Sequence, residues 1–154
     1  MSRKMSTSDP HAARQRWMRL CALAETQALE AALPADARDA EVDWLRPPET
    51  GMVMVQGRIG GGGAPFNLGE MPVTRCALAL ADGTVGHAYV AGRDHRKARA
   101  AALVDALMQR PETAPELERE LLTPLAASLA EADAQANRKT AATRVDFFTM
   151  VRGD

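Results

Sequence analysis

Residues 72–90 read PVTRCALALADGTVGHAYV, and this stretch decides the fold. Residues 72–81 alternate with a period of two, which is the period of a half-buried β-strand: one face has Thr74, Cys76, Leu78 and Leu80, and the other has Arg75, Ala77 and Ala79. Asp82-Gly83 then signals a tight turn, because glycine readily adopts the positive φ that such a turn requires. A return strand is expected over residues 85–90, so the stretch predicts an antiparallel hairpin.

The residues before this hairpin predict two more strands. One is expected over residues 41–46 and the other over residues 52–59, separated by a proline- and glycine-containing turn at 47–51. The second is apolar on both faces as far as Gln56, which indicates a central strand. The glycine run Gly60–Gly63 then leads into the hairpin. Together these segments predict an antiparallel meander of about four strands.

Helical patterns flank the meander on both sides, which gives the α+β class. Asp9-Pro10 is a typical helix start, and the helix is expected to run to Pro34. Its apolar stripe is formed by Trp17, Leu20, Cys21, Ala24, Ala28 and Ala31. A helix over residues 95–110 and further C-terminal helices follow, before a terminal strand or extended tail. Residues 1–10 are predicted to be disordered, and residues 11–154 to form a single α+β domain.

The composition excludes several classes of protein. The 154 residues are 46% hydrophobic and 25% charged, with a net charge of −1, so they lack the basic excess that nucleic acid or an anionic membrane attracts. No apolar run approaches the ~20 residues of a membrane helix, and the polar N-terminus is no secretory signal. We therefore expect a cytoplasmic protein in which Cys21 and Cys76 are buried thiols rather than a disulfide.

The glycine run is the first candidate site, because glycine-rich loops can hold phosphates with backbone amides. Gly57 and Gly62 have the spacing of a Walker A loop. The next two residues are Gly63 and Ala64, where that loop has lysine and then serine or threonine. The charge and the magnesium ligand are therefore missing, and a flexible hairpin connection is favoured. An anion-binding nest of amides and a contact with a partner protein stay open as alternatives.

We find no set of residues that predicts catalysis or a metal site. His11, His87 and His95 are far apart and share no ligand spacing, whereas zinc needs three or four convergent ligands. No Ser/His/Asp or Cys/His arrangement stands in a recognisable frame. The chain also lacks the cysteine cluster of an iron–sulfur site. The prediction is no catalytic residue, no metal and no cofactor.

Three residues near the ends of predicted elements are candidates for a ligand site or an interface: Arg75, Arg93 and Asp94. Asp94 stands where the helix over residues 95–110 begins, which favours a structural role as its N-cap. In the functional alternative, Arg93 and the helix N-terminus face an anionic ligand or a carboxylate of a partner. Arg75, on the strand over residues 72–81, is a further candidate for binding a phosphorylated small molecule.

The C-terminal residues 144–154 read RVDFFTMVRGD and are unusually apolar for a chain end. Aromatic, methionine and arginine side chains are enriched at the centres of protein interfaces. We expect this segment to be buried, either in the protein's own core or against another chain. The predicted interface residues are Arg144, Val145, Asp146, Phe147, Phe148, Met150 and Arg152.

Three blocks of sequence resemble one family, and the similarity runs from about residue 12 to residue 154. The blocks are PFNLGEMPVTRC (65–76), DGTVGHAYVAGRDHRKA (82–98) and RVDFFTMVRGD (144–154). In this order they resemble the G subunits of the bacterial carbon–phosphorus lyase system, the PhnG family. No catalytic residue is carried over by this resemblance.

The resemblance implies a cytoplasmic, non-catalytic subunit in a two-fold symmetric hetero-oligomer with subunits H, I and J. With H, I and the ATP-cassette-like subunit L, it would support displacement of the adenine of ATP by a phosphonate, which yields an alkylphosphonate ribose triphosphate. The nucleosidase chemistry is attributed to subunit I and carbon–phosphorus cleavage to subunit J. The alternative hypothesis is a stand-alone binding domain or enzyme for a phosphorylated small molecule.

Overall fold

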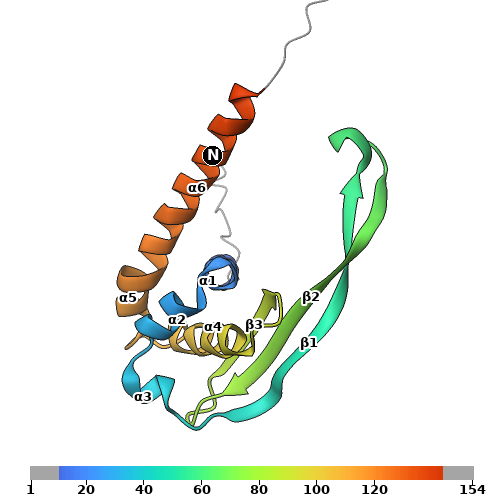
Figure 1. Ribbon diagram of the computed structural model, residues 1–154. Coiled ribbons are helices and arrows are strands. Elements are labelled where there is room, and N and C mark those ends of the chain that lie inside the picture. The colour runs from blue at the N-terminus through green and yellow to red at the C-terminus, as the bar shows by residue number, and fades with distance from the viewer. Residues whose placement is uncertain (1–10, 144–154) are drawn as a thin grey trace, which may run out of the picture.

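The computed structural model describes residues 11–143 (Figure 1). Its elements, in chain order, are α1 (Ala12–Leu23), α2 (Thr26–Ala32), α3 (Ala35–Arg38), β1 (Asp43–Arg58), β2 (Pro65–Ala79), β3 (Val85–Ala91), α4 (His95–Met108), α5 (Ala114–Leu117) and α6 (Thr123–Ala142). A 3-10 turn (Ile59–Gly61) joins β1 to β2, and a π-helical turn (Glu118–Leu122) joins α5 to α6. The α+β class is confirmed. The predicted terminal strand or tail lies outside the described residues, as does the predicted disordered segment 1–10.

Helix α4 is the centre of the core, packed between the sheet and helices α1 and α2. Every residue from Ala100 to Met108 is buried. Its alanines let the helix approach the strands closely, because they carry no bulk beyond Cβ. A Cβ placed on Gly86 of β3 would lie 2.0 Å from the carbonyl oxygen of Ala102, so only glycine fits there. The backbone of β3 at Gly86 therefore packs directly against the backbone of α4 at Ala102.

The sheet is antiparallel, with strand order β1-β2-β3. The hairpin predicted from residues 72–90 is confirmed: Gly83 has φ +84°, and the amide of Leu80 donates to the carbonyl of Thr84 at 2.9 Å. Strand β2 is central and β1 lies at the edge. The prediction that residues 52–59 form a central strand is therefore wrong.

The predicted strand count is also wrong, because residues 41–46 and 52–59 belong to one strand, and the described residues form a sheet of three strands rather than four. Strand β1 continues through Pro47 and Pro48 by shifting its register against β2 on both sides of Arg46. Proline is tolerated in this way on edge strands and at bulges, where no ladder hydrogen bond is needed from its nitrogen. Pairing with β2 thus overrides the local turn signal.

The outer part of the β1–β2 hairpin leaves the rest of the molecule as a long two-stranded ribbon (Figure 1). Strand β3 pairs with β2 only over Val73–Ala79, so residues before Val73 have no third strand beside them. We call residues 52–71 the arm and the other described residues the body. No arm side chain belongs to the hydrophobic core or packs against it. The arm is therefore outside the part of the chain that folds around α4.

The helix predicted from Asp9-Pro10 to Pro34 is two helices rather than one. Ala24 has φ −69° and ψ 157°, which ends α1 and turns the chain before α2. Leu29 and Leu33 are then buried, whereas Ala31 of the predicted stripe is exposed. The break re-aims the second helix so that its leucines reach α4.

Helix α6 is the second element that projects from the body, on the same side as the arm (Figure 1). It has 20 residues, and none of them is buried. Leu125, Ala126 and Leu129 near its start are the side chains that pack partly on the core. The rest is alanine-rich and polar, a composition with high intrinsic helix propensity. This helix satisfies its own backbone hydrogen bonds without further contacts.

Candidate functional site

The described residues hold no group of three or more His, Cys, Asp or Glu side chains that could bind a metal ion. His95 contacts the Thr50 hydroxyl through Nε2 at 3.0 Å, and that hydroxyl lies 3.0 Å from the Thr74 hydroxyl. Thr74 in turn donates to the carbonyl of Gly92 at 2.7 Å. This chain of bonds ties the start of α4 to the sheet beside the base of the arm, which is a structural role.

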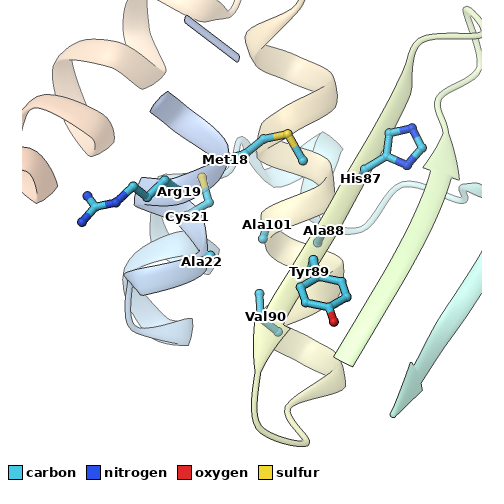
Figure 2. A pocket seen from close by; sticks show the side chains of 9 residues that line it. All are labelled: Met18, Arg19, Cys21, Ala22, His87, Ala88, Tyr89, Val90 and Ala101. Atoms are coloured by element: carbon cyan, nitrogen blue, oxygen red, sulfur yellow. The ribbon is translucent and has the colours of Figure 1, made fainter. Parts of the chain in front are cut away.

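A shallow apolar cavity of about 210 Å³ lies between α1 and β3 (Figure 2). It is smaller than most pockets that enclose small molecules, which have volumes of roughly 300–1,000 Å³. Burial, together with the charge of Asp105, raises the pKa of the Cys21 thiol to about 12. The thiol is therefore not ionised near neutral pH and cannot act as a nucleophile. In Figure 2 the charged end of Arg19 points away from the cavity.

Asp105 is the most polar group in the core, and its carboxylate is fully partnered. It accepts from Arg14 Nε at 3.1 Å and Nη2 at 2.8 Å, and from Trp17 Nε1 at 2.8 Å. The backbone amide of His87 donates to it at 2.9 Å. The side chain is 1% exposed. Asp105 thus joins α1, α4 and the edge of β3, and it has no free oxygen directed at a ligand.

Asp94 caps α4 as the sequence predicted: its carboxylate accepts from the Lys97 amide at 2.9 Å and from the Thr26 hydroxyl at 2.6 Å. These hydrogen bonds lower the pKa of Asp94. Arg93 precedes it, exposed to solvent. Because a carboxylate of the chain already occupies the positive end of α4, an added anion would be repelled there. The geometry favours the capping role.

Arg75 lies on the exposed face of β2, where its Nε donates to Glu49 at 2.7 Å. Glu49 also accepts from Arg46 at 2.6 Å, and the two arginines lower the pKa of Glu49. Arg75 is opposite Tyr89 in the sheet, whereas Arg93 lies beyond the end of β3. The two candidate arginines therefore have different surroundings, and Arg75 already has a carboxylate partner.

The glycine run forms the tip of the arm, so the hairpin-connection interpretation is confirmed. Gly60 and Gly61 have φ of +59° and +77°, which glycine adopts without strain. The amide of Gly63 donates to the carbonyl of Ile59 at 2.8 Å, and Arg58 Nη1 donates to the carbonyl of Gly63 at 3.1 Å. The guanidinium nearest the tip thus closes the turn.

The arm carries most of the large apolar side chains that the described residues leave exposed. They are Met52 at 50%, Met54 at 53%, Ile59 at 71%, Phe66 at 41% and Leu68 at 66%. Clustered exposed apolar side chains of this kind mark binding surfaces rather than ordinary solvent-facing strands. The arm is therefore the strongest candidate functional site that the structure describes.

Sequence reasoning finds only the glycine tip of this site, for which a partner contact is one of the open alternatives, and it misses the exposed apolar strands. The apolar residues of β1 predict a strand that is buried on both faces. The same pattern beside a glycine tip also fits an exposed hairpin. The predicted interface residues 144–152 lie outside the described residues. Within residues 11–143, no helix is both long enough and apolar enough to span a bilayer.

Comparison with known proteins agrees with the sequence blocks. Residues 12–153 match the family model for the phosphonate metabolism protein PhnG. Over 143 residues the chain is 48% identical to the alpha-D-ribose 1-methylphosphonate 5-triphosphate synthase subunit PhnG of Rhizobium meliloti (strain 1021), which covers 93% of this chain and 91% of the relative. The chain therefore belongs to the PhnG family of phosphonate metabolism proteins.

Proposed function

We propose that this chain is a non-catalytic, accessory subunit of an alpha-D-ribose 1-methylphosphonate 5-triphosphate synthase. The observation that carries the proposal is the 48% identity to a subunit of that synthase along nearly the whole chain. Two buried polar groups of the core have structural surroundings: the Cys21 thiol is protonated, and the Asp105 carboxylate is fully paired within the protein. In its complex the chain supplies shape and contacts, and neighbouring subunits supply reactivity.

The proposed reaction replaces the adenine of ATP by a phosphonate, forming an alkylphosphonate ribose triphosphate. The proposed partners are subunits H, I and J, in a two-fold symmetric hetero-oligomer, together with the ATP-cassette-like subunit L. The complex is proposed to work in the cytoplasm. Residues 11–154 are proposed to form one domain of it, with the apolar C-terminal segment as part of the interface.

The test is coexpression of the tagged full-length chain with the other subunits. We expect the tag to recover them as a complex that converts ATP and methylphosphonate, and we expect the chain alone to convert neither. Recovery of no partner by the intact chain would contradict the proposed function. Turnover by the isolated chain would show that it is itself the enzyme.

The C-terminal segment is tested by removing residues 144–154. We expect the shortened chain to keep its helical circular dichroism signal and to recover at most a tenth of the partner subunits. If it assembled as well as the intact chain, Phe147, Phe148 and Met150 would have no place in the interface.

The alternative, a stand-alone site for a phosphorylated small molecule at the glycine loop, Arg75 and Arg93, is tested by calorimetry. We expect no heat of binding when ATP or methylphosphonate is added to the isolated chain. Tight binding that disappears in Arg93→Ala would favour this alternative over the accessory role.

A further inference from the structure

The arm has one apolar face, and a β-bulge creates it. Val53 and Val55 point to the same side of β1, because side chains alternate along a strand. On β2, Met71 pairs with Val53 and Phe66 pairs with Gly57, so both lie on that side as well. The register shifts by one residue between Val55 and Gln56. Without this shift Phe66 would lie on the opposite face, so the bulge gathers the apolar side chains together.

The register shift also places Phe66 and Leu68 against the backbone of Gly57. The ring of Phe66 lies 3.5 Å from the position that a Cβ on Gly57 would take, and the Cβ of Leu68 lies 4.0 Å from it. Phe66 therefore covers the bare backbone of Gly57, as aromatic side chains do across from glycine in sheets. Together Val53, Val55, Phe66, Leu68 and Met71 form what we call the apolar face of the arm.

The opposite face of the arm is more polar, although it also carries the exposed side chains of Met52 and Met54. On this face Gln56 and Asn67 form a side-chain hydrogen bond at 3.4 Å, and Glu70 pairs with Met54 across the ribbon. The arm is thus amphipathic, with one face suited to water and one suited to a protein surface.

A two-stranded ribbon is marginally stable in water unless a third strand or a packed surface supports it. The body provides neither, because no arm side chain packs against the core and β3 does not extend beside the arm. Among residues 11–143, therefore, nothing covers the apolar face of the arm.

We propose that the apolar face of the arm docks on an uncharged, apolar surface of a different subunit of the synthase. This proposal rests on the proposed function, which supplies the existence of such a subunit. Between residues 52 and 71 the only charged side chains are Arg58 and Glu70. The arm therefore lacks the charges that would complement an acidic or a basic partner surface. A specific interface uses about 20–30 residues from each side, which is about the size of the arm.

A second copy of this chain is the other occupant that the test must distinguish. Pairing between two arms along β2 is hindered, because Pro65 and Pro72 lack the amide hydrogen that strand pairing uses and Glu70 places a charge between them. These residues are typical of an edge that is protected against self-association, which favours docking by the face of the ribbon.

The experiment compares the double variant Phe66→Asp/Leu68→Asp with Leu45→Asp in tagged full-length chains coexpressed with the other subunits. Leu45 is the matched control, because it is 57% exposed on the same hairpin but lies outside the arm. We expect the double variant to recover at least tenfold less partner than wild type, and Leu45→Asp to recover wild-type amounts. Normal recovery by the double variant would overturn the proposal.

Two further measurements distinguish a loss of docking from a loss of folding. The isolated double variant is expected to melt within about 2 °C of wild type, because the arm contributes nothing to the core. In the wild-type complex, amide hydrogens of residues 52–71 are expected to exchange more slowly than in the isolated chain, and unchanged exchange would overturn the proposal without any variant.

The outcomes separate the two proposals. If the wild-type chain recovers the subunits and the arm variant does so equally well, the docking surface is elsewhere and the proposed function stands. If the wild-type chain recovers nothing, the proposed function itself fails. If light scattering shows that the isolated chain is a dimer that Phe66→Asp/Leu68→Asp dissociates, the occupant is a second copy and the docking proposal is wrong.

Discussion

Strand β2 has two halves with opposite surroundings. Five of the seven residues 73–79 are buried, and this half of the strand has a neighbouring strand on each side, whereas residues 65–70 are all exposed. Leu78 is 0% exposed and Leu68 is 66% exposed, although they are the same residue type on the same strand. The two halves therefore differ in what lies beside them more than in how apolar they are.

The body is stabilised by its own core, whereas the arm is proposed to be stabilised by docking on another subunit. In the body, helix α4 packs on all three strands, and every buried polar side-chain atom in the described residues has a hydrogen-bond partner. In the arm, no element between residues 11 and 143 covers the apolar face. Substitutions in the body should therefore change stability, and substitutions in the arm should change assembly.

Asp105→Ala is expected to have the largest effect, because Asp105 is the buried charge that joins three elements of the body. The substitution leaves Trp17 Nε1 and the His87 amide without an acceptor and Arg14 without its carboxylate. Asp105 is 1% exposed and Arg14 is 33% exposed, so the cost comes chiefly from the donors left without an acceptor, at about 1–3 kcal/mol each. Urea unfolding followed by circular dichroism measures the loss.

Glu118→Ala is the matched control for Asp105→Ala. Glu118 also pairs with an arginine of α1, Arg16, at 2.9 Å, but both side chains are more than a third exposed. An exposed pair contributes at most about 1 kcal/mol. If the two variants lost equal stability, burial of Asp105 would not be what matters in the body.

Gly86→Ala and Gly69→Ala make the same chemical change in the body and in the arm. At Gly86 the added methyl would meet the carbonyl oxygen of Ala102 at 2.0 Å, whereas at Gly69 nothing lies within 4 Å. Overpacking of this kind costs about 3 kcal/mol, because α4 must move away from β3. Gly69→Ala should change stability by less than about 1 kcal/mol. Thermal unfolding of the two variants measures these losses of stability. Similar losses for Gly86→Ala and Gly69→Ala would contradict the proposed difference between body and arm.

The parts of the fold that follow from local patterns could be predicted from the sequence. The turn at Asp82-Gly83, the strand after it and the Asp94 cap depend on residues within a few positions of one another. The continuation of β1 through Pro47 and Pro48 could not be predicted, since it depends on pairing with β2. The break at Ala24 likewise depends on packing against α4, to which no single residue near it points.

The buried polar network around Asp105 and the candidate site on the arm were harder to predict than the local elements, for the same reason. The partners of Asp105 on α1, Arg14 and Trp17, lie 91 and 88 positions away in the chain, so a carboxylate in the middle of a helix gives no signal of its role. The alternation of Val53 and Val55 does predict an apolar face. It does not say whether that face meets the protein's own helices or another chain.

Asp94→Ala tests the boundary between body and arm, where the start of α4 is tied to the base of the arm through His95 and Thr50. Loss of an N-cap side chain costs about 1 kcal/mol, and here the Thr26 hydroxyl also loses its acceptor. Asp133→Ala on the exposed α6 is the control, with an expected change below about 0.5 kcal/mol. Chemical denaturation at neutral pH measures the loss of unfolding free energy in both variants. If Asp94→Ala lost no more than Asp133→Ala, the Asp94 cap would not stabilise the start of α4.

The smallest effect is expected at the turn between β2 and β3, which is the body's counterpart of the glycine tip. Asp82 accepts from the Thr84 amide at 3.0 Å and from Arg110 Nε at 2.8 Å, and these bonds lower its pKa to about 2. A carboxyl group with a lowered pKa stabilises the folded state above its unfolded pKa of about 4, and this contribution is lost as the pH falls through about 2.

Asp82→Asn removes the charge and keeps an oxygen for the Thr84 amide. The difference in unfolding free energy between wild type and variant should therefore be largest at pH 5 and above, and it should shrink between pH 4 and pH 2. Other carboxylates titrate in the same range, but they are common to both proteins and cancel in the difference. Because Asp82 is exposed, the difference is small at any pH, and urea titrations at closely spaced pH values are needed to measure it. A difference that stayed constant from pH 6 to pH 2 would mean that the charge of Asp82 does not stabilise the turn, which would then be held by its backbone and Gly83.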